Sequence, residues 1–495
     1  MKRRTALPGY IVSIFVHGIL MLVLLHWYLP LPFRAIQELV FQPGLAENSD
    51  GDVTGGFDDM LSAASAGEPG FAASMVQVAA TPAQPFALVQ GNTTFSSPSQ
   101  FLSTSTSSWT PGGAFGDPRG SAFGGRGEGK GFLLGQFGGT EGSEKAVALG
   151  LEWLAEHQNP NGSWSYDFTK NVKCRGKCGN PGPHTSVNSA TALAILPFLG
   201  CGVTPKSGDP RYRQVVDKGL KFLLQNGKRR PEGLSFIDSL PGEGPMYHHG
   251  IAAIAICEAA TMTQDPVLKD AAQQAINFIC HAQIPTDGGW RYEPRDKTGG
   301  DTSVFGWQIM ALKSGQMGGA NVPPEVFFKA QRFLDSVVGI DKGSMYGYMS
   351  TRDLQSDNRG QSSIGYVRST TPIGLLCQMY MGWNADHPSL KQGVEYLAAK
   401  GPDRNNLYYN YYATQVMHHY GGEAWRRWNL AQRDSLIARQ SLEGHERGSW
   451  YFDGKWNDDG GRLYTTSLAI MILEVYYRHL PLYQKQAAES EFPLD

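Results

Sequence analysis

The chain lacks an excess of charge of either sign and is poor in cysteine. Its 43 lysine and arginine residues and 45 aspartate and glutamate residues leave a formal net charge of -2, so nothing electrostatic favours nucleic acid as a partner. Six cysteines in 495 residues are too sparse for a dense disulfide framework. Alternating apolar and polar runs are also missing, so strands are expected to be minor. The 41% of hydrophobic residues must then build a mainly helical core.

Two of the cysteines differ from the other four in their surroundings. The four lie inside apolar helical runs, where a buried free thiol is the ordinary state. Cys174 and Cys178 lie instead in the polar loop Lys173–Cys178. An oxidising compartment would allow a disulfide between them that pins this loop. A metal site would need two more ligands and no second cysteine pair exists, so we expect no metal and no cofactor.

The N-terminus carries one long apolar run. Gly9–Leu29 is almost wholly apolar, and as a helix at about 1.5 Å per residue it would span the ~30 Å hydrocarbon core. The basic residues at 2–4 favour a cytoplasmic N-terminus and an extracytoplasmic body, periplasmic in a Gram-negative cell. A cleaved signal peptide is the alternative, but no small-residue cleavage site follows the run directly. We expect a cytoplasmic stub (1–8) and a single-pass transmembrane anchor (9–30).

Two polar residues lie inside this anchor. Ser13 and His17 are four residues apart and would share one helix face. The stretch Ser13–Gly18, after a basic start, resembles the membrane anchor of TonB. That family uses Ser and His at this spacing to couple to a proton-driven motor complex, so the resemblance implies an ExbB/ExbD-like partner. The alternative is a histidine tolerated near a helix end or against a neighbouring helix.

Residues 31–140 are rich in Gly, Ser, Thr and Pro, as in Ser103–Ser108. Such a segment cannot bury enough apolar surface to offset the entropy of ordering. We expect a disordered linker that lets the body move relative to the membrane. The folded body would then comprise 141–485, with a tail at 486–495.

From Glu144 onward, pairs of apolar helical stretches repeat six times, each joined by a Gly- or aromatic-marked turn. The second stretch of each pair is the more continuously apolar, as in Ile251–Ile256, and a helix apolar all round is buried. Second helices should therefore form an inner ring and first helices an outer ring, and six pairs suffice to close a barrel. After the first pair, which ends with Thr185–Leu199, the expected pairs are Val215–Leu224 with His248–Ala260, Ala271–Ala282 with Thr302–Ser314, Val326–Val338 with Thr370–Gly382, Leu390–Ala399 with Tyr411–Tyr420, and Trp425–Leu442 with Tyr464–Tyr477.

Three of the turns share a glutamine followed by a glycine and a tryptophan. The glutamine and tryptophan pairs are Gln158 with Trp164, Gln283 with Trp290, and Gln440 with Trp450. They resemble the Gln-Trp repeats of squalene-hopene and oxidosqualene cyclases. The wider body, roughly 144–480, resembles the α/α toroid of those cyclases and of protein prenyltransferase β subunits. The resemblance implies an all-α toroid of about six hairpins, in which each glutamine caps helices, stacks on its tryptophan and ties neighbouring hairpins together.

One acidic residue precedes the third inner helix. Asp301 can be a helix N-cap, or it can face the centre of the ring as an acid. The cyclases place an Asp-rich motif there to protonate an alkene or epoxide, whereas this chain has a single Asp followed by Thr302 and Ser303. The prenyltransferases hold zinc through an Asp and a Cys two residues on, and Ser303 stands where that Cys would be. The chain therefore departs from both motifs.

Polar residues also mark the starts of the other inner helices, and in a closed ring they would meet Asp301 at one mouth of the barrel. Clustered helix N-termini favour an anion or a carbonyl group there, and N-capping is the ordinary role of the Ser and Thr residues among them. The candidate binding residues at this mouth are His184, Tyr247, His248, His249, Trp307, Arg368, Tyr411, Tyr412 and Tyr464.

Two function classes follow. The first is a binding module that holds an isoprenoid lipid, a glycan or a peptide without turnover, favoured by the missing acid motif, the missing zinc ligands and the long tether. The second is an enzyme resembling terpenoid cyclases, or a carbohydrate-active α/α barrel, with Asp301 as acid or base assisted by His248, His249 or Tyr412. A deep aromatic cavity would favour a terpenoid, and a shallow groove with paired carboxylates would favour a glycan.

Overall fold

The computed structural model describes residues 124–126, 130–240, 243–339, 343–349 and 363–479. The expected anchor at 9–30, with Ser13 and His17, lies outside the described residues. Within the described ranges, no helix combines the length and the apolar character needed to cross a membrane.

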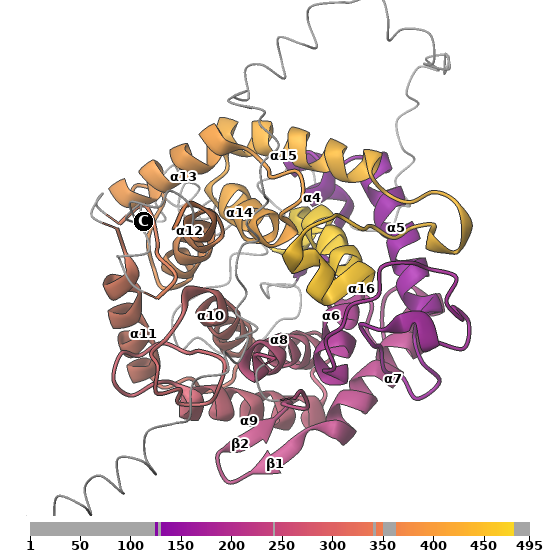
Figure 1. Cartoon of the computed structure of the whole chain (residues 1–495), viewed down its shortest axis with the longest axis horizontal. Helices are drawn as coiled ribbons and strands as arrows, with labels where there is room; N and C mark the ends of the chain where they lie inside the picture. The colour runs from indigo at the N-terminus through magenta and orange to yellow at the C-terminus, as the bar shows by residue number, and fades with distance from the viewer. Residues whose placement is uncertain (1–123, 127–129, 241–242, 340–342, 350–362, 480–495) are drawn as a thin grey trace, which may run out of the picture. The chain divides into compact units, whose positions relative to one another are not determined.

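Twelve of the helices in the described part form two concentric rings (Figure 1). Each inner helix contacts the next one, and the last contacts the first, so the inner ring is closed. The inner helices are α6 (Val187–Gly200), α8 (Pro245–Thr263), α10 (Thr302–Met317), α12 (Ser363–Tyr380), α14 (Leu407–Tyr420) and α16 (Lys455–Leu473). The outer helices are α5 (Glu141–Glu156), α7 (Pro210–Asn226), α9 (Pro266–Ala282), α11 (Pro324–Val337), α13 (Pro388–Lys400) and α15 (Gly422–Ala438). The body is thus an all-α, six-hairpin α/α toroid, as expected.

Burial explains which helix of each hairpin lies inside. In α8 nearly every residue is buried, whereas α11 buries only one face, which includes Val326, Ala330 and Val337 at helical spacing. Proline occupies the first turn of α7, α9, α11 and α13, where its missing N–H costs nothing. The strands of the described part are the short antiparallel pair β1 (Lys228–Arg230) and β2 (Gly233–Ser235).

Each of the three Gln-Trp turns fastens its own hairpin to the outer helix of the next one. Each glutamine donates from Nε2 to one carbonyl in its own turn and to one in the next hairpin, at 2.8–3.0 Å. The acceptor pairs are Gly162 and Val215 for Gln158, Gly288 and Val326 for Gln283, and Gly448 and Ala146 for Gln440. The indole N–H groups bond the ends of the preceding outer helices, namely Trp164 to Leu154, Trp290 to Ile279 and Trp450 to Leu436. Because Ala146 lies in α5, the Gln440 turn joins the last hairpin to the first.

Each Gln-Trp turn has a glycine at the point where its backbone passes close to the backbone of the next outer helix. Gly448 has a φ of +94°, and a Cβ at this position would lie 2.1 Å from the carbonyl oxygen of Leu149 in α5. Gly162 and Gly288 have the same conformation and the same proximity to the next outer helix. Any side chain here would push neighbouring hairpins apart.

Both ends of the described chain pack beneath the ring, at the C-terminal ends of the inner helices. The segments η1 (Gly124–Arg126) and α4 (Lys130–Phe137) contact α17 (Val475–Arg478), which follows α16. Arg126 is buried and donates to the backbone carbonyl of Arg478 at 3.2 Å. Because η1 and α4 fall inside the linker expected at 31–140, the ordered body begins before residue 141.

Candidate functional site

Asp301 lies immediately before α10 and is wholly buried. Its Oδ1 caps the helix by accepting from the Val304 N–H at 2.8 Å and from the Ser303 hydroxyl at 2.6 Å. Its Oδ2 has no hydrogen-bond partner. Burial raises the pKa of this carboxyl to about 6, against the opposing effects of the Ser303 hydrogen bond and of Arg291. Asp301 is therefore both the cap and a group able to exchange a proton near neutral pH.

Tyrosines from several segments surround Asp301. The hydroxyl of Tyr247, in α8, is hydrogen-bonded to Ser303 Oγ. Tyr408, at the start of α14, donates to the Ser303 carbonyl at 3.1 Å. Burial, and after it the charge of Asp301, raises the pKa of Tyr247 well above its ordinary value, so this phenol stays neutral. Tyr292 follows α9 and Tyr348 follows α11, and their hydroxyls lie 2.5 Å apart.

A second group of side chains continues the site toward α6 and α16. The His184 ring centroid lies 5.9 Å from those of Tyr166 and His248. His248 is in the first turn of α8, its Nδ1 has no partner, and burial lowers its pKa to about 3, so it is a neutral imidazole. Tyr464, in α16, has a hydroxyl without a partner. Burial, and after it the nearby phenols of Tyr408 and Tyr166, raises the pKa of Tyr464 well above its ordinary value, so Tyr464 lies near both groups.

Some of the residues expected at the mouth lie elsewhere. His249 points outward. Its Nε2 donates to the carbonyl of Ala275 in α9, and its Nδ1 accepts from the N–H of Phe236, which follows β2, both at 3.2 Å. Successive helix positions are about 100° apart, so His248 and His249 cannot both face the mouth. Tyr412 is wholly buried, and a Cβ on Gly306 in α10 would meet its hydroxyl at 3.1 Å. The side chain of Arg368 lies outside the described residues.

Side chains fill the ring below the mouth. The Trp307 and Tyr411 rings stack with centroids 5.7 Å apart, although α12 separates their helices in the ring. Below them, Glu258 forms ion pairs with Arg126 at 2.7 Å and with Arg478 at 3.0 Å, and all three side chains are 1–3% exposed. No local sequence pattern predicts this cluster, because its members come from three distant segments. The floor of the ring is therefore charged.

The polar cysteine loop differs from expectation. Cys174 and Cys178 are free thiols in the structure, so the disulfide expected between them is not formed. They lie beside His157 and His445, and the four residues make a group that could hold a metal ion. In the part of the chain that the structure describes, this is the one such group of three or more residues. The expectation of no metal counted cysteine pairs only and so missed both histidines.

Comparisons with known proteins give structural neighbours only. No family model matches the chain, and no curated protein matches it. The GH76A α-1,6-mannanase of Salegentibacter sp. HEL1_6 is similar, with 12% identity, a TM-score of 0.46, and coverage of 68% of this chain and 98% of that one. The type II terpene cyclase MstE from Scytonema is also similar, with 13% identity, a TM-score of 0.43, and coverage of 69% of this chain and 100% of that one.

Proposed function

We propose that this protein is a ligand-binding module, anchored to the membrane by residues 9–30, whose extracytoplasmic toroid holds a hydroxyl-rich polar ligand such as a glycan. The binding site is the mouth of the inner ring, between Asp301 and His248. The apolar N-terminal run and the basic residues before it support the anchor and its orientation. Coupling through Ser13 and His17 to an ExbB/ExbD-like motor complex is compatible with this role.

The observation that carries the proposal is a set of buried polar atoms at the mouth without hydrogen-bond partners. These atoms are Asp301 Oδ2, His248 Nδ1, Tyr464 Oη and Arg291 Nε. Buried polar atoms nearly always have a partner in folded proteins, so a ligand or water must supply one here. Phenol and imidazole groups donate and accept hydrogen bonds while their rings offer apolar surface, a combination suited to a molecule with many hydroxyl groups.

The charged floor argues against a deep isoprenoid site. An isoprenoid chain would need an apolar channel along the ring axis. Trp307 and Tyr411 fill part of that axis, and the buried ion pairs of Glu258 lie below them. Placing a hydrocarbon chain against these charges would forfeit the apolar burial that makes such binding favourable.

A second candidate function is acid or base catalysis by Asp301 on the ligand bound there. The specific observation is the unpartnered Oδ2 of a carboxyl whose pKa burial raises to about 6. If the bound ligand is turned over, Asp301→Asn should abolish turnover and leave binding largely intact. Turnover that persists in this variant would remove Asp301 from the reaction.

Native mass spectrometry of the full chain in mild detergent, combined with lipid extraction and an oligosaccharide library, tests the proposal. We expect no stoichiometric isoprenoid and specific retention of an oligosaccharide. Tyr464→Phe removes only one hydroxyl and should weaken that binding by roughly 5- to 30-fold, the range for one lost hydrogen bond at a buried site. The matched control is Tyr420→Phe, at the C-terminal end of α14 and away from the mouth. A copurifying isoprenoid or peptide in place of the glycan would overturn the proposed ligand.

A further inference from the structure

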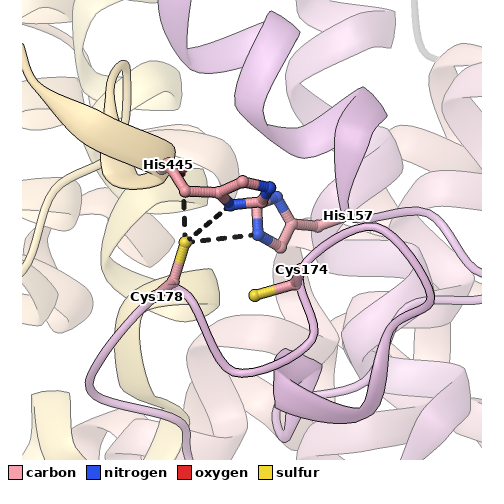
Figure 2. Close-up of side chains that lie close together, drawn as sticks. All are labelled: His157, Cys174, Cys178 and His445. Carbon is pink, nitrogen blue, oxygen red and sulfur yellow. Dashed lines mark hydrogen bonds between the residues drawn. The ribbon is translucent and has the colours of Figure 1, made fainter.

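Four side chains with metal-binding chemistry meet where the first hairpin touches the last (Figure 2). His157 follows α5, and Cys174 and Cys178 lie in the loop between α5 and α6. His445 comes from the short helix η4 (Gly444–Glu446), between α15 and α16. One ligand atom from each residue lies within 4.8 Å of all the others. His157 and both cysteines are buried, and His445 is half-buried.

The separations within the cluster approach those of a tetrahedral zinc site. With Zn–S near 2.3 Å and Zn–N near 2.0–2.1 Å, a tetrahedron places a sulfur about 3.6 Å from each nitrogen. Cys178 Sγ lies 3.5 Å from His157 Nε2 and 3.1 Å from His445 Nδ1. The first distance matches the tetrahedral value and the second is somewhat shorter.

The protonation of His157 is fixed in the form that a metal requires. Its Nδ1 lies 2.7 Å from the backbone carbonyl oxygen of Trp153, which can only accept, so Nδ1 carries the proton. Its Nε2 therefore directs a lone pair into the cluster. The ring also stacks on the Trp153 indole with centroids 3.9 Å apart. A carbonyl that orients the imidazole through its other nitrogen is the usual support of a metal-bound histidine.

Cys178 has more acceptors around it than one thiol can satisfy. Figure 2 shows its Sγ facing His157 Nε2 and His445 Nδ1, and the His445 carbonyl oxygen lies 3.3 Å away. A single S–H can donate to one acceptor at a time. A cation in the centre would accept electron pairs from both sulfurs and both nitrogens together.

The cysteine loop is shaped to present both sulfurs on one side. The two cysteines are separated by three residues, a spacing found among structural zinc ligands. Asn171 Oδ1 accepts from the backbone N–H of Cys174 at 3.2 Å, and Arg175 and Gly176 both adopt positive φ, which turns the chain back on itself. The Lys177 N–H then bonds the Cys174 carbonyl at 3.0 Å and closes the turn.

We propose that His157, Cys174, Cys178 and His445 form a structural zinc site that fastens the last hairpin to the first. Two thiolates and two imidazoles in a tetrahedral arrangement are the donor set that Zn²⁺ prefers. Two thiolates neutralise the charge of the ion, so the basic residues of the cysteine loop do not oppose it. All four positions are filled by the protein, so the role is structural rather than catalytic.

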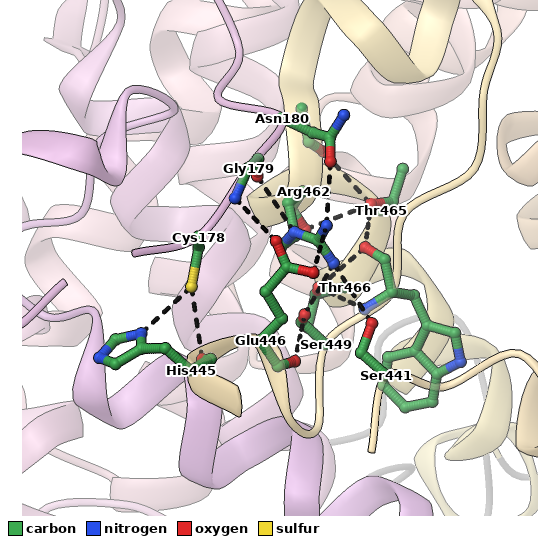
Figure 3. A network of polar contacts seen from close by, with 12 residues as sticks. Cys178, Gly179, Asn180, Ser441, His445, Glu446, Ser449, Arg462, Thr465 and Thr466 are labelled. Atoms are coloured by element: carbon green, nitrogen blue, oxygen red, sulfur yellow. Dashed lines mark hydrogen bonds and ion pairs between the residues drawn. The ribbon is translucent and has the colours of Figure 1, made fainter. Parts of the chain in front are cut away.

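A polar network beside the cluster holds the cysteine loop and the η4 segment next to each other (Figure 3). The Gly179 N–H donates to Glu446 Oε1 at 2.7 Å, one residue beyond Cys178 and one beyond His445. Arg462 donates to the Gly179 carbonyl at 3.1 Å and forms an ion pair with Glu446 at 2.9 Å. The ligands on either loop are therefore positioned before any metal arrives, which lowers the ordering needed for binding.

The test measures zinc in the full chain, purified in mild detergent without reducing agent, loaded with zinc sulfate and dialysed. We expect about one zinc ion per chain by elemental mass spectrometry, and with cobalt an intense visible absorption typical of tetrahedral thiolate coordination. Cys174→Ser with Cys178→Ser, and separately His445→Asn, should lower the zinc content at least tenfold. Cys280→Ser and His281→Asn, on α9 and away from the cluster, are the matched controls and should retain it.

The wild-type chain alone decides the proposal even if the cysteine variants fail to fold. Chelation of the loaded wild-type chain should lower its melting temperature, and added zinc should restore it. Less than about a tenth of a zinc ion per chain after dialysis would overturn the proposal. A Cys174–Cys178 disulfide found by intact-mass and peptide mapping would overturn it as well.

Discussion

Replacing Glu258 by Gln should destabilise the whole toroid, because this carboxylate forms ion pairs with two buried guanidinium groups. Arg126 Nη1 donates to Oε2 at 2.7 Å, and Arg478 Nη2 donates to Oε1 at 3.0 Å and to Oε2 at 3.2 Å. Burial alone would raise the pKa of Glu258, but the two arginines hold it below its ordinary value. Glutamine keeps the shape and removes the charge, so Arg126 would lose its ion pair and Arg478 would keep only the longer one with Glu474, at 3.7 Å.

The magnitude follows from the burial of the cluster. Removing one partner of a buried ion pair costs about 3–5 kcal/mol, since the remaining charge stays desolvated. A folded body of roughly 340 residues has an unfolding entropy of about 0.7 kcal/mol/K, so this cost lowers the melting temperature by about 4–7 °C. The comparable exposed pair is Glu423 with Arg427, at 3.1 Å, where Glu423→Gln should cost at most about 0.5 kcal/mol, or less than 1 °C.

Scanning calorimetry of wild type and both variants at one scan rate gives the comparison. A second readout is tryptic cleavage after Arg126, which should accelerate in Glu258→Gln because η1 loses its contact with the ring floor. If Glu258→Gln melts within 1 °C of wild type and resists trypsin equally, the inference that two buried guanidinium groups depend on this carboxylate is refuted.

Three other substitutions test the ring seam and the mouth. Gln440→Ala leaves the Ala146 and Gly448 carbonyls without their donor and should lower the free energy of unfolding in urea by about 1–3 kcal/mol. Gln158→Ala should cost a similar amount, and a cost at Gln158 alone would contradict closure of the ring. Burial raises the pKa of Asp301 to about 6 from an ordinary 3.8, so the folded state retains a proton that the unfolded chain loses. The contribution of Asp301 to stability should therefore fall as the pH rises from 3.8 to 6, by up to about 3 kcal/mol. Asn can still cap α10 but does not titrate, so in urea titrations across that range the stability of wild type should fall relative to that of Asp301→Asn, and parallel profiles would contradict the raised pKa.

The helical hairpins and their inner and outer rings could be predicted because the signals are local. Continuous apolar character in α8 and a one-sided stripe in α11 each require only a window of neighbouring residues. The Gln-Trp turns were visible for the same reason. The direction of single side chains was not, since it depends on the rotation of each helix about its axis. His248 and His249 were therefore placed together at the mouth, although only His248 lies there.

The clusters that the sequence did not reveal all combine distant segments. Glu258 meets Arg126 across 132 residues and Arg478 across 220. Likewise, the spacing of Cys174 and Cys178 is a local pattern, but the two histidines that complete the cluster lie outside the cysteine loop. The local spacing of the two cysteines therefore predicts a disulfide, whereas only the closed ring brings His445 to the same place.

The same separation explains why a metal would act at this seam rather than between other hairpins. In the unfolded chain, bringing His157 to Cys178 closes a loop of 21 residues, whereas bringing His445 to Cys178 closes one of 267. Since the entropic cost grows as (3/2)RT ln n, the longer closure costs about 2 kcal/mol more. The other hairpin junctions join elements that follow one another in the chain and avoid this cost. The Gln440 turn, the Arg462 network and the proposed zinc ion all act at the one junction that must offset it, so loss of zinc should open the ring there first.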